Sequence, residues 1–238
     1  MKTVLITGGS RGIGSAMVKL FSNNGYKVAF TYKSSEQEAM ALSEMCGALA
    51  IRADRASDSE IIAAVSTAND KFGPIDCLIN NAAISSFSLL TDITCDDWNK
   101  TFSVNVTAAF LYSKYVIPQM LNKKQGRIIN ISSMWGVVGS SCEVLYSSSK
   151  AALIGMTKAL AKELGPSGIT VNAIAPGVID TKMNSSLSEE DMAQLKEDTP
   201  LLRIGSPSEV AEVALFLAGD GASFITGDVI NVSGGYIV

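Results

Sequence analysis

The sequence lacks histidine entirely: none occurs among its 238 residues. Histidine is the side chain whose charge changes most readily near neutral pH, and it is the commonest metal ligand. Its absence excludes Ser-His-Asp triads, Cys-His pairs and the zinc or iron sites that depend on imidazole. Any acid–base chemistry must therefore come from tyrosine, lysine, aspartate, glutamate or water.

Cysteines are also few, and they lie far apart. The four of them form no Cys-x-x-Cys pair, so neither a zinc site nor a disulfide framework is expected. A free cysteine behaves as a small apolar residue, which is the role we expect for Cys46, Cys77, Cys95 and Cys142. We therefore expect no metal centre.

Long apolar runs and basic tracts are missing as well. No apolar run reaches the roughly 20 residues of a membrane-spanning helix. The chain passes from Met1-Lys2 directly into a predicted strand rather than a signal peptide. The formal net charge is −4, and Lys123-Lys124 is the only basic cluster. These absences predict a cytoplasmic protein that binds neither membranes nor nucleic acid.

What the chain has instead is a regular alternation of apolar runs and helical patterns. Strand-like runs cover residues 3–7, 27–32, 48–52, 76–80, 127–132, 170–175 and 228–232, and helical patterns cover 12–24, 35–46, 57–72, 96–121, 146–164 and 207–218. Continuous Val/Ile/Leu runs are typical of strands buried on both faces of a parallel sheet. The alternation predicts an α/β fold, a Rossmann-type doubly wound parallel sheet of about seven strands with helices on both faces.

Residues 1–238 are expected to form a single domain, because 47% of them are hydrophobic and no shift in composition marks a boundary. One segment is irregular: 180–206 is rich in Ser, Glu, Asp and Met and has only a weak helical pattern. It follows the carboxyl end of a predicted strand, where ligands bind in this architecture. We expect a substrate lid there; a plain surface excursion is the alternative.

A glycine-rich stretch, Thr7-Gly8-Gly9-Ser10-Arg11-Gly12-Ile13-Gly14, lies between the first predicted strand and the first predicted helix. Glycines let the backbone approach a pyrophosphate without a Cβ in the way, and the helix that follows offers free N–H groups and a positive dipole end. The spacing predicts a dinucleotide site, with an ordinary strand-to-helix turn as the alternative.

Tyr146 and Lys150 are four residues apart in a predicted helix, so they lie on the same face. A neighbouring cation stabilises a phenolate and lowers the pKa of the tyrosine, which makes it able to donate a proton to a carbonyl oxygen. Ser133 follows a predicted strand and can meet Tyr146 at the carboxyl edge of the sheet. Asn80-Asn81 follows another strand at the same edge, and Asn105 lies in the long helix between them.

With these residues the chain resembles the short-chain dehydrogenase/reductase family over essentially its full length. The matching motifs are Thr7 to Gly14, Asn80 to Ala83, Asn105, Ser133, Tyr146 with Lys150, and Pro176-Gly177. Ala83 replaces the glycine that is usual in the family, which adds one methyl group near the nicotinamide ribose.

The resemblance implies roles for the catalytic residues Asn105, Ser133, Tyr146 and Lys150. Tyr146 is the general acid in reduction and the base in oxidation. Lys150 lowers the pKa of Tyr146 and holds the nicotinamide ribose. Ser133 binds the substrate carbonyl and the developing oxyanion. Asn105 anchors a water that links Lys150 to solvent.

The charges near the second predicted strand indicate NADP(H) as the cofactor. An acid at the end of that strand would bind the 2′-hydroxyl of NAD, and none is present in Phe30-Thr31-Tyr32-Lys33. Arg11, Thr31 and Lys33 instead suit a 2′-phosphate, with Glu36 as the opposing feature. The resemblance adds Asp54 as an adenine contact. The expected cofactor-binding residues are Gly8, Ser10, Arg11, Gly12, Ile13, Gly14, Thr31, Asp54, Asn81, Ala82, Tyr146, Lys150, Pro176, Gly177, Ile179 and Thr181.

The substrate is a ketone whose identity the motifs leave open. The glycine loop and the chain's end resemble 3-oxoacyl-(acyl carrier protein) reductases of fatty acid biosynthesis. Of the two basic residues with which those enzymes dock the carrier beside the cleft, Lys124 is present and Ser167 replaces the other.

The segment around Trp135 and Glu143 resembles elongation factor P 5-aminopentanone reductases, in which Glu143 would pair with a substrate ammonium and Trp135 would flank it. The expected substrate residues are thus Ser133, Trp135, Glu143 and Tyr146. Hydroxysteroid and sugar dehydrogenases share the same scaffold and stay open as functions, followed last by a non-catalytic dinucleotide sensor. The family implies a homotetramer.

Overall fold

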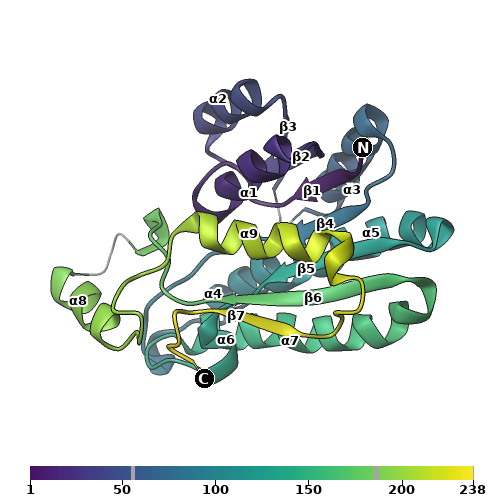
Figure 1. Cartoon of the computed structure of the whole chain (residues 1–238). Helices are drawn as coiled ribbons and strands as arrows, with labels where there is room; N and C mark the ends of the chain where they lie inside the picture. The colour runs from purple at the N-terminus through teal and green to yellow at the C-terminus, as the bar shows by residue number, and fades with distance from the viewer. Residues whose placement is uncertain (55–56, 185–187, 238) are drawn as a thin grey trace.

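The computed structural model describes residues 1–54, 57–184 and 188–237. Its centre is a seven-stranded sheet in the order β3-β2-β1-β4-β5-β6-β7, with every neighbouring pair parallel (Figure 1). The strands are β1 Thr3–Ile6, β2 Lys27–Tyr32, β3 Leu49–Arg52, β4 Cys77–Asn80, β5 Gly126–Ile131, β6 Ile169–Pro176 and β7 Val229–Val232. The sequence-based prediction of a doubly wound parallel sheet is confirmed.

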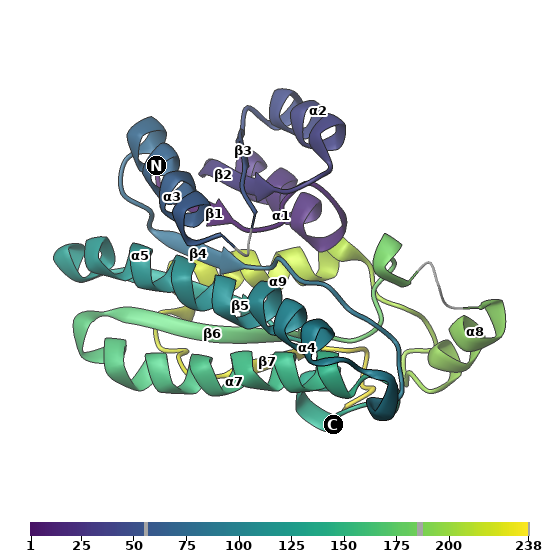
Figure 2. The same cartoon turned by 180° about the vertical axis from the view of Figure 1, so that it is seen from behind.

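Helices cover both faces of the sheet, as predicted (Figures 1 and 2). The principal α-helices are α1 Gly12–Asn23, α2 Glu36–Cys46, α3 Asp58–Phe72, α4 Cys95–Phe102, α5 Ala108–Lys123, α6 Met134–Val138, α7 Val144–Leu164, α8 Glu189–Glu197 and α9 Pro207–Ala218. Alternate side chains of one strand enter different cores: Val4 and Ile6 pack with α1 and α9, whereas Leu5 packs with α3 and α5. Burial on both faces explains why β1 is apolar at every position after its first.

The long helix predicted over 96–121 is interrupted. A π-helical segment, Ser103–Thr107, separates α4 from α5. Periodicity of the sequence does not reveal such a segment, because a single π-helical turn is rare and too short to have a pattern of its own. Asn105 lies in the middle of this segment and is almost fully buried.

Among the described residues, two further α-helices were not predicted. The five-residue α6 is too short to have a periodic pattern. Helix α8 lies inside the irregular segment and begins at a capping box, in which the hydroxyl of Ser188 accepts from the Asp191 backbone N–H at 3.1 Å. That Ser-x-x-Asp pattern was visible in the sequence and is a helix-start signal.

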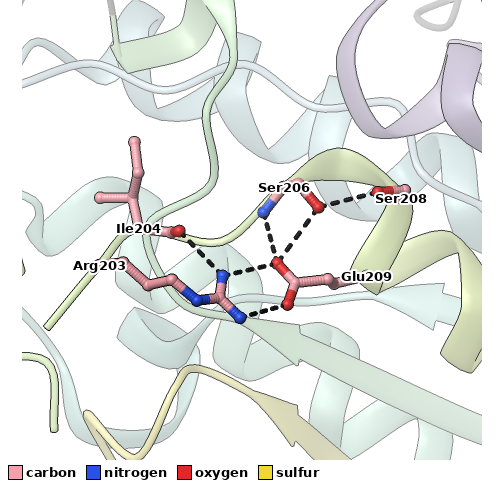
Figure 3. A network of polar contacts seen from close by, with 5 residues as sticks. All are labelled: Arg203, Ile204, Ser206, Ser208 and Glu209. Atoms are coloured by element: carbon pink, nitrogen blue, oxygen red, sulfur yellow. Dashed lines mark hydrogen bonds and ion pairs between the residues drawn. The ribbon is translucent and has the colours of Figure 1, made fainter. Parts of the chain in front are cut away.

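The two ends of the segment between β6 and α9 are joined by backbone hydrogen bonds. Gly205 donates its N–H to the carbonyl of Val178, and the Asp180 N–H returns a bond to the Gly205 carbonyl, both at 2.9 Å. The guanidinium of Arg203 forms a bidentate ion pair with Glu209 in the first turn of α9, at 2.6 and 3.0 Å (Figure 3). The predicted lid spans 180–206, of which 185–187 lie outside the described residues, and its closing motion stays a prediction.

Within the described part of the chain, no helix is both long and apolar enough to cross a membrane.

Candidate active site

The site lies at the carboxyl edge of the sheet, where the loops after β1, β4, β5 and β6 meet. Ser133 follows β5 and is the N-cap of α6: its hydroxyl accepts from the backbone N–H of Trp135 at 3.2 Å. Helix α6 packs closely on α7, which has Glu143 at its N-cap position and contains Tyr146 and Lys150 in its first two turns. The predicted catalytic residues of β5 and α7 are thus brought together.

Tyr146 and Lys150 are buried, with exposed fractions of 9% and 2%. Tyr146 is hydrogen-bonded to Ser133. Lys150 places its Nζ 5.6 Å from the centroid of the Tyr146 ring and donates a hydrogen bond to the Ile131 carbonyl at 2.8 Å. A buried ammonium is costly unless a polar group faces it, and that carbonyl supplies one partner.

Burial dominates the protonation of both residues. It raises the pKa of Tyr146 to about 12; the hydrogen bond from Ser133 lowers it and the charge of Glu143 raises it further. Burial lowers the pKa of Lys150 to about 7. The expected lowering of the tyrosine pKa by Lys150 is not found in this structure: desolvation is the largest effect on both residues, and it disfavours both charged forms. A protonated phenol is nevertheless the form that can act as an acid.

The side chain of Asn105 joins two elements. Its Oδ1 accepts from the Ile84 N–H and its Nδ2 donates to the Ile84 carbonyl, both at 2.9 Å. The same Nδ2 donates to the hydroxyl of Ser149 on α7 at 3.0 Å. Asn105 therefore connects the loop after β4 to the helix that contains Tyr146. Its predicted role as a water anchor stays a prediction.

The glycine loop is held by hydrogen bonds from the loop that follows β4. Asn81 donates from Nδ2 to the carbonyls of Thr7 and Gly8, at 2.9 and 3.1 Å. Gly8 and Gly12 have φ values of 67° and 53°, which favour glycine. A Cβ on Gly14 would overlap the Gly8 carbonyl oxygen. The loop thus needs glycine to pass this close to the neighbouring backbone.

The start of α1 is suited to an anion. Arg11 is its N-cap residue, no side chain among the described residues caps it, and its first turn contains no acid. Its first N–H groups are therefore available to a pyrophosphate. Thr181, in the loop after β6, lies beside the same turn, 3.3 Å from where a Cβ of Gly12 would be. These features fit a dinucleotide without adjustment.

The residues around β2 agree in part with the prediction of a 2′-phosphate site. Arg11 is exposed at the loop, and Thr31 is buried with its hydroxyl accepting from the Gly8 N–H at 3.3 Å. Lys33 forms a 2.8 Å ion pair with Asp54, so its charge is already partly balanced. Arg11 is consequently the stronger of the two cations for a 2′-phosphate.

The predicted substrate side contains an aromatic pair. The Trp135 ring packs edge-on against Tyr236 of the C-terminal segment, with ring centroids 5.4 Å apart. Glu143 is half-buried, and burial raises the pKa of its carboxyl. Within the described ranges, its carboxylate has neither a hydrogen bond nor an ion pair. Tyr236 was missed by sequence reasoning, because nothing in the local sequence indicates that the end of the chain returns to α6.

Comparison with known proteins identifies the family. A family model described as enoyl-(acyl carrier protein) reductase matches residues 8–237. A 3-oxoacyl-(acyl carrier protein) reductase of Aquifex aeolicus is 41% identical over 98% of this chain and 96% of its own length. The corresponding reductase of Synechocystis is 42% identical over 100% and 97%. The chain belongs to the short-chain dehydrogenase/reductase family.

Solved structures agree with this membership. A short-chain dehydrogenase/reductase from Serratia marcescens, a double mutant, superposes with a TM-score of 0.93 at 37% identity and covers 99% of this chain and 97% of its own. A blue fluorescent protein from a metagenomic library, crystallised with NADPH, gives 0.94 at 38% identity, covering 100% and 98%. The family resemblance seen in the motifs is confirmed.

Proposed function

We propose that the protein reduces a ketone to a secondary alcohol with NADPH, as a 3-oxoacyl-(acyl carrier protein) reductase does. The observation that carries the proposal is the buried cluster of Ser133, Tyr146 and Lys150 at the edge where the glycine loop also ends. The curated relatives named as 3-oxoacyl reductases support the substrate class, and the neighbour crystallised with NADPH supports the cofactor.

The chain's own loops would hold the cofactor. The N-terminus of α1 and the glycine loop would hold the pyrophosphate, and Arg11 with Thr31 would hold the 2′-phosphate. The loops after β4 and β6 would contact the nicotinamide end. The remaining residues assigned to the cofactor are Gly8, Ser10, Gly12, Ile13, Gly14, Asp54, Asn81, Ala82, Tyr146, Lys150, Pro176, Gly177, Ile179 and Thr181.

Proton transfer follows from the protonation states. The hydride comes from the nicotinamide when NADPH is bound. Ser133 donates a hydrogen bond to the carbonyl oxygen as negative charge develops on it. Tyr146 is protonated at neutral pH because burial raises its pKa, and it gives its proton to that oxygen. Lys150 in its charged form then stabilises the resulting phenolate, and Asn105 holds the loop after β4 against α7.

Within a single chain, the two positions that correspond to carrier-docking residues lie away from the catalytic cluster. Lys124 precedes β5 and Ser167 precedes β6, so both lie at the amino edge of the sheet. The expectation that Lys124 lies beside the cleft is therefore wrong within one chain, since the catalytic cluster is at the opposite edge. We propose that residues 1–238 act as one domain and assemble into a homotetramer, as the family implies.

Glu143 favours a second candidate, the 5-aminopentanone group on elongation factor P. A half-buried carboxylate that has no hydrogen bond or ion pair with any described residue, three residues before Tyr146, suits a substrate with an ammonium near its ketone. Trp135 would flank that cation.

The two candidates are separated by one experiment on the purified protein. NADPH oxidation is compared with an acetoacetyl thioester and with aminoketone-bearing elongation factor P as substrates. Glu143→Gln is expected to reduce turnover of the aminoketone about tenfold or more and to leave the thioester rate unchanged. Glu163→Gln, an exposed acid at the far end of α7, is the control and should change neither rate. Equal loss of both activities in Glu143→Gln would exclude a role in selecting the ammonium.

A further inference from the structure

A buried hydroxyl inside the Tyr-x-x-x-Lys segment links the catalytic helix to the rest of the site. Ser149 is completely buried on α7. Its Oγ accepts from Asn105 Nδ2 at 3.0 Å and donates to the Tyr146 carbonyl at 2.7 Å. Both bonds are made away from water, where a lost partner is costly.

On its other side, Asn105 is bonded to both backbone groups of Ile84. The same loop begins at Asn81, whose amide holds the carbonyls of Thr7 and Gly8 in the glycine loop. A continuous series of hydrogen bonds and one short loop therefore runs from the glycine loop to the backbone of Tyr146. Ser149 is the last side chain in that series.

We propose that Ser149 is a positioning residue that fixes Tyr146 relative to the loops that hold the cofactor. The inference rests on the proposed function, since it gives Tyr146 and those loops their roles. Hydride and proton must reach adjacent atoms of one carbonyl, so a small displacement of α7 against the loop after β4 lowers the rate. Serine suits this position because it can accept from a side chain and donate to its own helix backbone at once.

The chain offers a matched control in the same helix. Thr157 is also completely buried, accepts from Asn130 Nδ2 at 2.8 Å and donates to the Leu153 carbonyl at 2.8 Å. The arrangement is chemically the same, but Asn130 lies within β5 rather than in the loop after β4. Thr157→Val removes this hydroxyl and leaves the side-chain volume nearly unchanged.

The test compares Ser149→Ala and Thr157→Val in the full chain. Both variants are expected to lower the melting temperature, because each leaves a buried amide with one partner fewer. Only Ser149→Ala should lower kcat for the acetoacetyl thioester, by about tenfold or more, with the Kd for NADPH unchanged within about twofold. Equal kcat losses in the two variants would overturn the proposal.

Hydrogen exchange gives a readout that does not depend on turnover. In the wild type and in Thr157→Val, added NADPH should slow exchange in peptides that cover 81–84 and 144–150. In Ser149→Ala the protection of 81–84 should be the same, whereas that of 144–150, where Tyr146 and Lys150 would contact the cofactor directly, should be weaker than in the wild type; equal protection of 144–150 would refute the coupling. Should Ser149→Ala not fold, Ser149→Cys takes its place, because a thiol is a weak donor and acceptor. Its kcat is expected to lie between that of the wild type and the rate without enzyme. A wild type that neither binds NADPH nor reduces the thioester would instead overturn the proposed function.

Discussion

At the scale of single residues, the burial of Tyr146 and Lys150 is the property that most shapes the chemistry. Both side chains lie out of water, so the protein keeps the phenol protonated and holds the lysine near the point where it loses its charge. A site arranged for stability alone would not bury a lysine, which indicates that function required it.

The first prediction at this scale concerns the acid. Tyr146→Phe removes the hydroxyl and keeps the ring, so NADPH should still bind with a Kd close to that of the wild type. We expect turnover of any accepted ketone to fall by about a hundredfold or more, because the proton donor is lost. Steady-state kinetics and cofactor fluorescence measure the two quantities. Near wild-type turnover would show that the proton comes from elsewhere.

The second prediction concerns how the burial of Lys150 lowers the free energy of unfolding. Its pKa is about 7 in the folded chain and 10.5 ordinarily, so the folded state binds fewer protons than the unfolded state between these values. Stability should therefore rise with pH in that window, on the order of 2 kcal/mol between about pH 7 and about pH 9, and the gain is lost as pH falls through about 7.

Lys150→Met removes the titrating group. The variant should be inactive, more stable than the wild type near pH 7, and less dependent on pH in urea unfolding. The difference from the wild type should shrink as the pH approaches 10.5. A wild type whose stability does not change with pH in this range would contradict the burial argument.

At the scale of elements, two helical glycines differ in how much room surrounds them: Gly14 next to the cofactor loop is crowded, and Gly155 in α7 is not. Gly14 lies in the first turn of α1, and a Cβ there would overlap the Gly8 carbonyl and lie 2.8 Å from Asn81 Nδ2. Gly155 is exposed in the middle of α7, with no atom within 4 Å of its Cβ position. The same substitution should therefore have opposite effects at the two positions.

Gly14→Ala should destabilise the fold by about 1–3 kcal/mol and weaken NADPH binding, because the loop must shift. Gly155→Ala should stabilise it by about 0.5–1 kcal/mol, because alanine has the higher helix propensity. Chemical unfolding and cofactor titration measure both. Destabilisation by Gly155→Ala would mean that this face of α7 is covered by something other than solvent.

At the scale of the whole molecule, cofactor binding should couple to global stability. A ligand that binds the folded chain alone stabilises it by about 2.7 kcal/mol at about 100 times its Kd. For a chain of this size that corresponds to roughly 5–10 °C in melting temperature. We expect NADPH to produce this shift at lower concentration than NADH. Arg11→Met should abolish that preference, and an unchanged preference would place the 2′-phosphate elsewhere.

The sequence by itself determined the sheet, and it predicted the cofactor loop and the catalytic pair. These follow from local patterns: apolar runs buried on both faces, glycines before a helix, and a tyrosine and lysine one turn apart on α7. Each of these signals lies within a few consecutive residues, so no knowledge of the fold was needed to find it. Helix α8 was not predicted, although its capping box was present in the sequence.

The tertiary structure alone decided which distant residues contact these parts and how burial shifts their pKa values. Asn105 and Ser149 are 44 positions apart, and Trp135 meets Tyr236 from the other end of the chain. The pKa values of Tyr146 and Lys150 depend on how deeply both are buried, and the spacing of the two residues pointed toward a lowered tyrosine pKa. Burial and long-range contacts depend on residues that are distant in the sequence and become neighbours only when the chain folds, so local sequence patterns do not specify them.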